Sequence, residues 1–192
     1  KAVALATGAM LVRNAVILAI FAPPAFVEGA APLALMLLAI AAAWRLPVRD
    51  ADRGESVDGS PAGPTLTLAS PFSLTAALRF GAVFLVLQVA GTLAQRFLGT
   101  SGFYAVSLAG GAVSSASAVA SAATLSASST LPPHVAAVGA IIASGTSALV
   151  DWPIVARIGG HRGLTRRVGR MLWFTVLLGA LGVVIQRAVH GL

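Results

Sequence analysis

The sequence predicts an all-α fold, a polytopic bundle of transmembrane helices, on three observations. Its mean hydropathy is +0.90, with 57% hydrophobic and 10% charged residues, whereas soluble domains carry about 25% charged residues. The apolar residues form runs of the length that crosses a hydrocarbon core of about 30 Å. Aromatic residues make up only 6% of the chain and there are 20 glycines, which favours closely packed helices over a membrane β-barrel.

This composition excludes a soluble enzyme, a secreted disulfide scaffold and a disordered tail. The formal net charge of +7 does not indicate nucleic-acid binding, because the basic residues gather between apolar runs, where they orient spans in a bilayer. The absence of cysteine excludes disulfides and thiolate metal sites. The chain opens on Lys1 without methionine, and Arg13 interrupts its first apolar run. We therefore expect it to begin inside a longer protein.

Six apolar segments are bounded by proline, glycine or charged residues, and we expect each to enter the membrane. The first ends before Pro23-Pro24, the second ends near Arg45, and the third extends from just after Pro71 to just beyond Arg96. The predicted segments are 2–21, 32–47, 73–98, 102–128, 133–158 and 168–189.

Residues 48–70 are predicted to be a solvated linker, because they hold most of the acidic residues, followed by glycine, serine and proline. They separate two parts of one membrane unit. Residues 1–47 are expected to form the end of a first membrane repeat, with two spans. Residues 71–192 are expected to form a second repeat, with three spans and one re-entrant or broken segment.

The fourth segment, 102–128, differs from an ordinary span. Its Gly110-Gly111 pair favours a break in the helix, and the residues that follow are too polar to face lipid on all sides. Hydroxyl side chains form one stripe on a helix there: Ser114, Ser117, Ser121, Thr124 and Ser128. The stripe has two interpretations, a lining for a polar solute or a surface for close helix packing. Packing is favoured.

An internal similarity relates the first and fifth segments. Leu11-Val12-Arg13 aligns with Leu149-Val150-Asp151, and a turn and a further apolar span follow each. Arginines follow the second segment and also lie between the fifth and sixth. The positive-inside rule places both clusters in the cytoplasm only if the fourth segment is re-entrant. The two repeats are then inverted, as in many secondary transporters.

Arg13 and Asp151 are the most informative single residues, since each lies inside an apolar segment at equivalent repeat positions. An ionisable group at bilayer depth costs at least ~2.5 kcal/mol. The two can contact a solute, form a structural salt bridge, or, for Asp151, lie at the membrane interface beside Arg157. Ser144 and Ser147 share a helix face with Asp151. The residues predicted to line a pathway are Arg13, Asn14, Ser114, Ser117, Ser121, Ser144, Ser147 and Asp151.

Three short runs resemble a known family. They are Pro71-Phe72-Ser73-Leu74, Gly110-Gly111-Ala112-Val113-Ser114-Ser115 and Leu11-Val12-Arg13-Asn14. The chain resembles, over nearly its whole length, the C-terminal membrane domain of bacterial MgtC/SapB-type membrane proteins, a domain of unknown function (4010). The resemblance implies a preceding Gly-Gly-x-Val-Ser-Ser segment and an MgtC-like module upstream. It carries over no functional residue. Some relatives have acidic residues in the segment equivalent to 112–118, where this chain has none, so metal-cation binding there is not expected.

The sequence therefore predicts a multi-pass protein of the bacterial inner membrane that moves a small solute or ion. A non-transporting membrane subunit that regulates a partner through helix packing is the alternative. No enzyme activity is expected, since the chain lacks G-x-S-x-G and H-E-x-x-H motifs. No catalytic, cofactor or metal site is expected. The expected partners are the lipid bilayer and the solute or ion, with a homo-oligomer left open and nucleic acid excluded.

Overall fold

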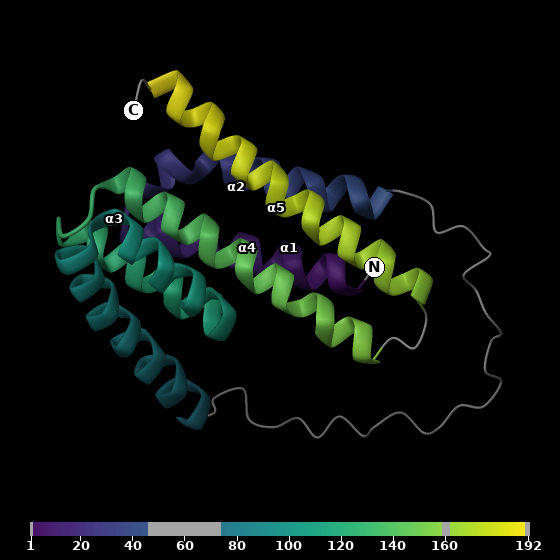
Figure 1. The fold of residues 1–192 in the computed structure, drawn as a ribbon, viewed down its shortest axis with the longest axis horizontal. Coiled ribbons are helices and arrows are strands. Elements are labelled where there is room, and N and C mark those ends of the chain that lie inside the picture. The colour runs from purple at the N-terminus through teal and green to yellow at the C-terminus, as the bar shows by residue number, and fades with distance from the viewer. Residues whose placement is uncertain (1, 46–73, 159–161, 191–192) are drawn as a thin grey trace.

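The computed structural model describes residues 2–45, 74–158 and 162–190, and these form an all-helical bundle (Figure 1). Its helices are α1 (Ala2–Phe21), α2 (Pro23–Arg45), α3 (Leu74–Ala127), α4 (Pro133–Ile158) and α5 (Arg162–His190). Each of the five contains a stretch long and apolar enough to cross a membrane. The predicted all-α, multi-pass fold class is confirmed. The predicted linker, 48–70, lies outside the described residues.

Helices α1 and α2 form one antiparallel pair, and α4 and α5 form another (Figure 1). The pairs meet where α2 crosses α5 in antiparallel register, with Met36 against Gly179 and Pro32 against Gly182. A Cβ atom on Gly182 would lie 2.6 Å from the Cα of Pro32. The backbones can approach this closely only because residue 182 has no side chain.

Large apolar side chains cover the outer faces of the helices. Ile20, Leu78 and Phe97 are examples, with 65–75% of their surface exposed. The buried core consists mainly of alanine, leucine and valine from α1, α2, α3 and α4. An apolar exterior around a core of small residues is typical of helices that pack within a bilayer, and it is consistent with contact to lipid.

Two helix boundaries differ from the sequence-based expectation. The second span was predicted to begin at residue 32, but α2 begins at Pro23 and includes Glu28 and Pro32. Proline is well accommodated in the first turn of a helix, where its missing N–H has no intrahelical partner. Inside α2, Pro32 is buried against α5. The sixth span was predicted from 168, whereas α5 begins at Arg162.

Helix α3 is divided into three parts at two residues with non-helical backbone. Gly99 has φ 65° and ψ −155°, and Ser114 has φ −162° and ψ 101°. The left-handed φ at residue 99 is one that only glycine adopts readily. The first part, 74–98, matches the predicted third span. We call residues 100–127 the hairpin, with a first arm (100–113) and a second arm (115–127).

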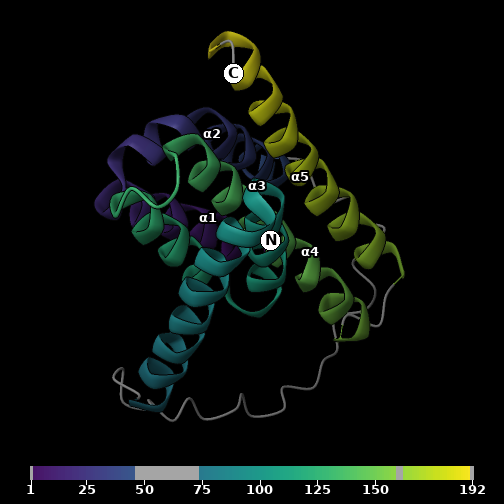
Figure 2. The ribbon, with the colours of Figure 1, turned by 60° about the vertical axis from the view of Figure 1, so that its left-hand side comes forward.

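The hairpin turns back on itself at Ser114. A Cβ atom on Gly110 would lie 3.2 Å from the Cβ of Ala118, whereas eight residues of continuous helix span about 12 Å. The two arms therefore lie side by side, as both ribbon views show (Figure 1, Figure 2). The predicted broken segment is confirmed, but the break falls at Ser114, three residues beyond the expected Gly111.

Gly110 and Gly111 serve packing instead of the break. A Cβ atom on Gly111 would collide with the backbone carbonyl of Ala143 in α4, and one on Gly110 would lie 2.8 Å from the side chain of Leu87. Both glycines therefore allow the first arm to pack closely between α4 and the first part of α3.

The hairpin begins and ends at the same end of the bundle (Figure 1). We call this the Pro133 end, because α4 begins there just after the second arm stops, and the turn between α1 and α2 lies there too. The opposite end, the Arg45 end, holds the last residues of α2 and α4 and the start of α5. Its described basic side chains are Arg45, Arg157, Arg166, Arg167 and Arg170.

Candidate functional site

The hairpin tip lies about halfway along α1 and α4. Gly111 packs on Ala143 of α4, and Arg13 of α1 reaches Ser115 on the other side of the break. Non-helical backbone at membrane depth is tolerated only where protein buries it or where it lines a cavity. We call the polar side chains gathered at this level the tip cluster: Arg13, Asn14, Ser114, Ser115, Ser117 and Ser144.

Ser114 caps the second arm. Its Oγ accepts a hydrogen bond from the backbone N–H of Ser117 at 3.3 Å and lies 3.0 Å from the Oγ of Ser117. Extended backbone with a side-chain oxygen bonded three residues ahead is the geometry of a helix N-cap. The first amides of the second arm have no intrahelical acceptor, so the positive end of its dipole lies at the tip.

Asn14 is fully buried and joins α1 to α4. Its Nδ2 donates to the Oγ of Ser144 at 2.9 Å, and Ser144 donates in turn to the carbonyl of Ala140 at 2.8 Å. The single hydroxyl proton of Ser144 is used by Ala140, so Ser144 can only accept from Asn14. This chain of donors fixes which way the amide of Asn14 points.

The Oδ1 atom of Asn14 has no hydrogen-bond partner in the structure, although it is buried. A buried acceptor left without a donor costs about 1–3 kcal/mol. The residue is therefore a buried acceptor at the level of the hairpin tip that no donor among the described residues satisfies.

Arg13 brings a positive charge to the same level. Its Nη2 donates to the Oγ of Ser115 at 3.3 Å, and this contact uses one of the five N–H donors of a guanidinium. Ser115 is 97% buried, whereas Arg13 is exposed on the bundle surface. The guanidinium charge and the positive end of the second arm thus converge at the tip.

Arg13 and Asp151, which the repeat made equivalent, form no ion pair among the described residues. Because Asn14 is level with Ser144, Asp151 lies seven residues, or about 10 Å, further along α4. Helices α1 and α4 are antiparallel and cross at Ser144, seven residues before Asp151. Arg13 and Asp151 therefore lie at different levels of the bundle. Asp151 is half-buried toward the Arg45 end, with the half-buried Ser147 between it and the cluster.

The hydroxyl stripe of the second arm faces the first part of α3. Ser117 donates to the carbonyl of Phe80 at 3.5 Å, and Ser121 donates to Oε1 of Gln88 at 3.3 Å. Thr124 bonds back to its own helix. These contacts are those of a packing surface, the interpretation that the sequence favoured, and only the Ser114 end of the stripe belongs to the tip cluster.

Sequence reasoning missed two participants. Ser115 lies beside the stripe and was not a candidate, although it is the residue that Arg13 contacts. Gln88 is a polar residue inside an apolar span, and that pattern alone was a signal for it. Among the described residues no group of three or more histidine, aspartate or glutamate side chains gathers as a metal site.

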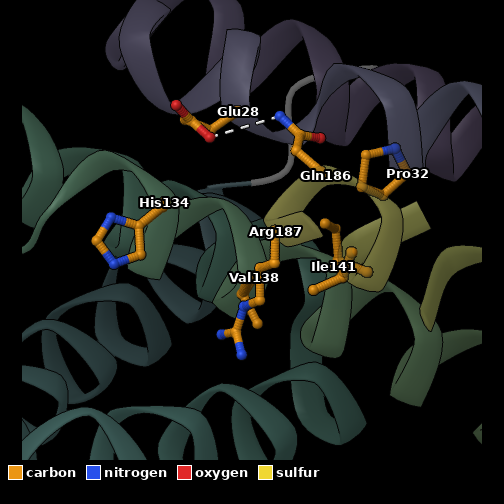
Figure 3. Close-up of a pocket in the computed structure, with 8 residues that line it drawn as sticks. Glu28, Pro32, His134, Val138, Ile141, Gln186 and Arg187 are labelled. Atoms are coloured by element: carbon orange, nitrogen blue, oxygen red, sulfur yellow. Dashed lines mark hydrogen bonds between the residues drawn. The ribbon is translucent and has the colours of Figure 1, made fainter. Parts of the chain in front are cut away.

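A small cavity lies near the Pro133 end, between α2, α4 and α5 (Figure 3). Its volume is about 20 Å³, enough for one water molecule. Gln186 spans it, donating through Nε2 to Oε2 of Glu28 at 3.5 Å and to the carbonyl of Val27 at 3.4 Å. Arg187 turns away from Glu28 and donates to the hydroxyl of Tyr104. The cavity is separate from the tip cluster.

These features define a multi-pass helical membrane protein in which a helical hairpin, broken at Ser114, contacts α1 and α4. Residues 1–159 match the family described as Domain of unknown function (DUF4010). The chain belongs to this family. No curated protein and no solved structure matches the chain.

Proposed function

We propose that this protein moves a small polar solute or ion across the membrane and that the tip cluster is its binding site. The observation that carries the proposal is the buried, unpartnered Oδ1 of Asn14, which lies at the level of a helix break. A break, a buried open acceptor and a guanidinium at one level of a membrane bundle are the elements of a solute site in many transporters.

The charges of the cluster favour an anionic or strongly polar solute over a metal cation. Arg13 and the N-terminal end of the second arm both contribute positive potential, and no acidic side chain belongs to the cluster. The open acceptor of Asn14 requires at least one donor on the solute. A small anion that carries a hydroxyl, an amine or an acidic proton meets both requirements.

An inverted repeat is part of the same proposal. The α1/α2 and α4/α5 pairs cross in two places, at Asn14 with Ser144 and at Pro32 with Gly182. Two antiparallel helix pairs that pack on each other, α1 against α4 and α2 against α5, suit a transporter in which one repeat rocks against the other around a fixed site. We also propose that the chain lies in the bacterial inner membrane as part of a protein of the MgtC/SapB type. The resemblance of its three short sequence runs to that family supports this proposal.

A flux assay with the full-length protein in liposomes tests the proposal. The informative variant is Asn14→Leu combined with Ser144→Ala, because it removes both partners of the buried hydrogen bond and leaves no new unpaired group. Such paired replacement is close to neutral for stability. We expect the double variant to fold with a Tm near that of the native protein and to lose at least tenfold of the flux of small hydroxylated or amino-bearing anions.

The matched control is Thr7→Val, which replaces another fully buried α1 side chain that bonds only within its own helix. It should keep native flux. Full flux in the Asn14/Ser144 double variant refutes the site. No flux by the native protein across a panel of anions, cations and neutral solutes favours the non-transporting regulatory subunit.

A further inference from the structure

A groove opens on the outer surface between α4 and α5 near the Arg45 end. Its volume is about 480 Å³. The side chains that line it are Trp152, Arg166, Arg170, Trp173, Phe174 and Leu177. None of these is acidic, so the lining combines two positive charges with an aromatic and aliphatic wall.

The floor of the groove is fixed by Trp152. Its Nε1 donates to the backbone carbonyl of Thr165 at 3.3 Å, which ties the indole of α4 to the first turns of α5. Gly169 permits this contact, since a Cβ atom there would lie 2.7 Å from Nε1 of Trp152. The groove is therefore built by specific contacts between the two helices.

The lining changes from charged to apolar along α5. Arg166 and Arg170 lie one turn apart on one face, and Trp173, Phe174 and Leu177 continue that face in the following turns. Since α5 begins at Arg162 at the end of the bundle, the arginines lie outermost and the apolar residues lie deeper. Leu177 lies eleven residues after Arg166, so the lining spans about 16 Å along α5.

A phospholipid in a bilayer has its phosphate outermost and its acyl chains deeper, which is the order of the arginines and the apolar wall in this groove. Guanidinium groups bind phosphate through paired N–H donors, and tryptophan is enriched where headgroups meet hydrocarbon. The deeper wall of Trp173, Phe174 and Leu177 offers an acyl chain a surface that is 49–59% exposed. A water-soluble phosphate would use only the outer half of this groove.

We propose that the α4/α5 groove binds an anionic phospholipid, with its phosphate on Arg166 and Arg170 and one acyl chain along Trp173 to Leu177. The bound lipid bridges α4 and α5 at the Arg45 end. The phosphate end of the site is separate from the tip cluster: Val176 packs on Gly145, next to Ser144, and Arg170 and Arg166 lie about 9 and 15 Å before Val176 along α5. Only the deep end of the groove, at Leu177, reaches the level of the cluster. The test of the lipid site is independent of transport.

Native mass spectrometry of the full-length protein in detergent measures the binding. The probes are phosphatidylglycerol and phosphatidylcholine with identical acyl chains. Each of Arg166→Gln and Arg170→Gln should weaken phosphatidylglycerol binding about fivefold and phosphatidylcholine binding by less, because the choline ammonium offsets the charge of the phosphate that both lipids share. Arg45→Gln is the matched control, since Arg45 is an exposed arginine at the same end of the bundle but outside the groove. It should change neither lipid.

Two further arms separate the alternatives. Trp173→Ala should weaken both lipids to a similar extent, because it shortens the apolar wall. Inorganic phosphate at millimolar concentration should not displace phosphatidylglycerol. Should a glutamine variant fail to fold, Arg166→Lys and Arg170→Lys replace it, and they should keep most of the preference for the anionic lipid. The proposal is overturned if Arg45→Gln weakens binding as much as the groove variants do, or if phosphate displaces the lipid.

Discussion

Gly111→Ala tests how tightly the hairpin tip is held against α4. In the native structure a Cβ atom at residue 111 would lie 2.6 Å from the Cα of Ala143 and would collide with the carbonyl oxygen of that residue. These are backbone atoms of a packed helix, so no side-chain rotation relieves the overlap. The shortest ordinary van der Waals contact is 3.4 Å, and the first arm must therefore move by at least 0.8 Å from α4.

Overpacking of this kind costs about 1–3 kcal/mol. Displacement of the first arm also moves Ser114, three residues after Gly111, and weakens the contact between Arg13 and Ser115. We expect Gly111→Ala to lower both the free energy of unfolding and the flux. Thermal unfolding of the purified protein measures the first effect, and liposome flux measures the second.

Gly81→Ala is the matched control, because a Cβ atom there meets nothing within 4 Å. Alanine in a helix is favoured over glycine by up to about 1 kcal/mol, so this variant should be as stable as the native protein or slightly more stable. The reasoning is refuted if Gly111→Ala unfolds at the native temperature, or if Gly81→Ala is as destabilised as Gly111→Ala.

Two further substitutions extend these expectations. Ser114→Ala removes the N-cap of the second arm and should lower the free energy of unfolding, measured by chemical denaturation, by about 1 kcal/mol. Ser114→Asp retains a capping oxygen and should lose less. Equal losses of stability in the two variants would contradict the capping role. Gly182→Ala should separate α2 from α5 at Pro32 and lower Tm clearly. Gly145→Ala is the control and should keep the native Tm, because its new Cβ atom would lie 3.5 Å from the nearest atom, in Val176. Equal Tm values for the two variants would contradict the close crossing.

The sequence predicted most helices because each needs only an apolar run of sufficient length. The start of α2 was missed because Pro32 looked like a boundary, and proline inside a membrane helix is tolerated when a neighbour packs closely on it. Here Gly182, 150 residues away, supplies that neighbour. The packing of α5 on α2, and not the local sequence, therefore decides whether Pro32 ends the helix.

The candidate site was predictable in part. Arg13 and Asn14 were identifiable as polar residues within an apolar run, and Ser144 as part of a polar face. Their convergence on the hairpin tip depends on the depth at which α1 crosses α4, which no sequence pattern specifies. The same depth places Asp151 about 10 Å beyond Arg13.

The groove on α4 and α5 was not predictable from either helix alone. Trp152 and Trp173 are 21 residues apart in the sequence and read there as separate apolar positions. They become one surface only because Gly169 allows α4 and α5 to meet.

The central claim, that the hairpin tip is a solute site at membrane depth, is tested most directly by labelling Ser115→Cys with a membrane-impermeant maleimide. These 192 residues contain no cysteine of their own, which makes the label specific within them. Ser128→Cys, in an exposed position, and Val119→Cys, in a fully buried one, give the upper and lower limits of reactivity. Ser115 is 97% buried in this structure, so a solute site requires that the hairpin tip open to water during transport; we then expect Ser115→Cys to be labelled and flux to stop as it is labelled. A rate as low as that of Val119→Cys, or labelling with undiminished flux, would contradict the claim.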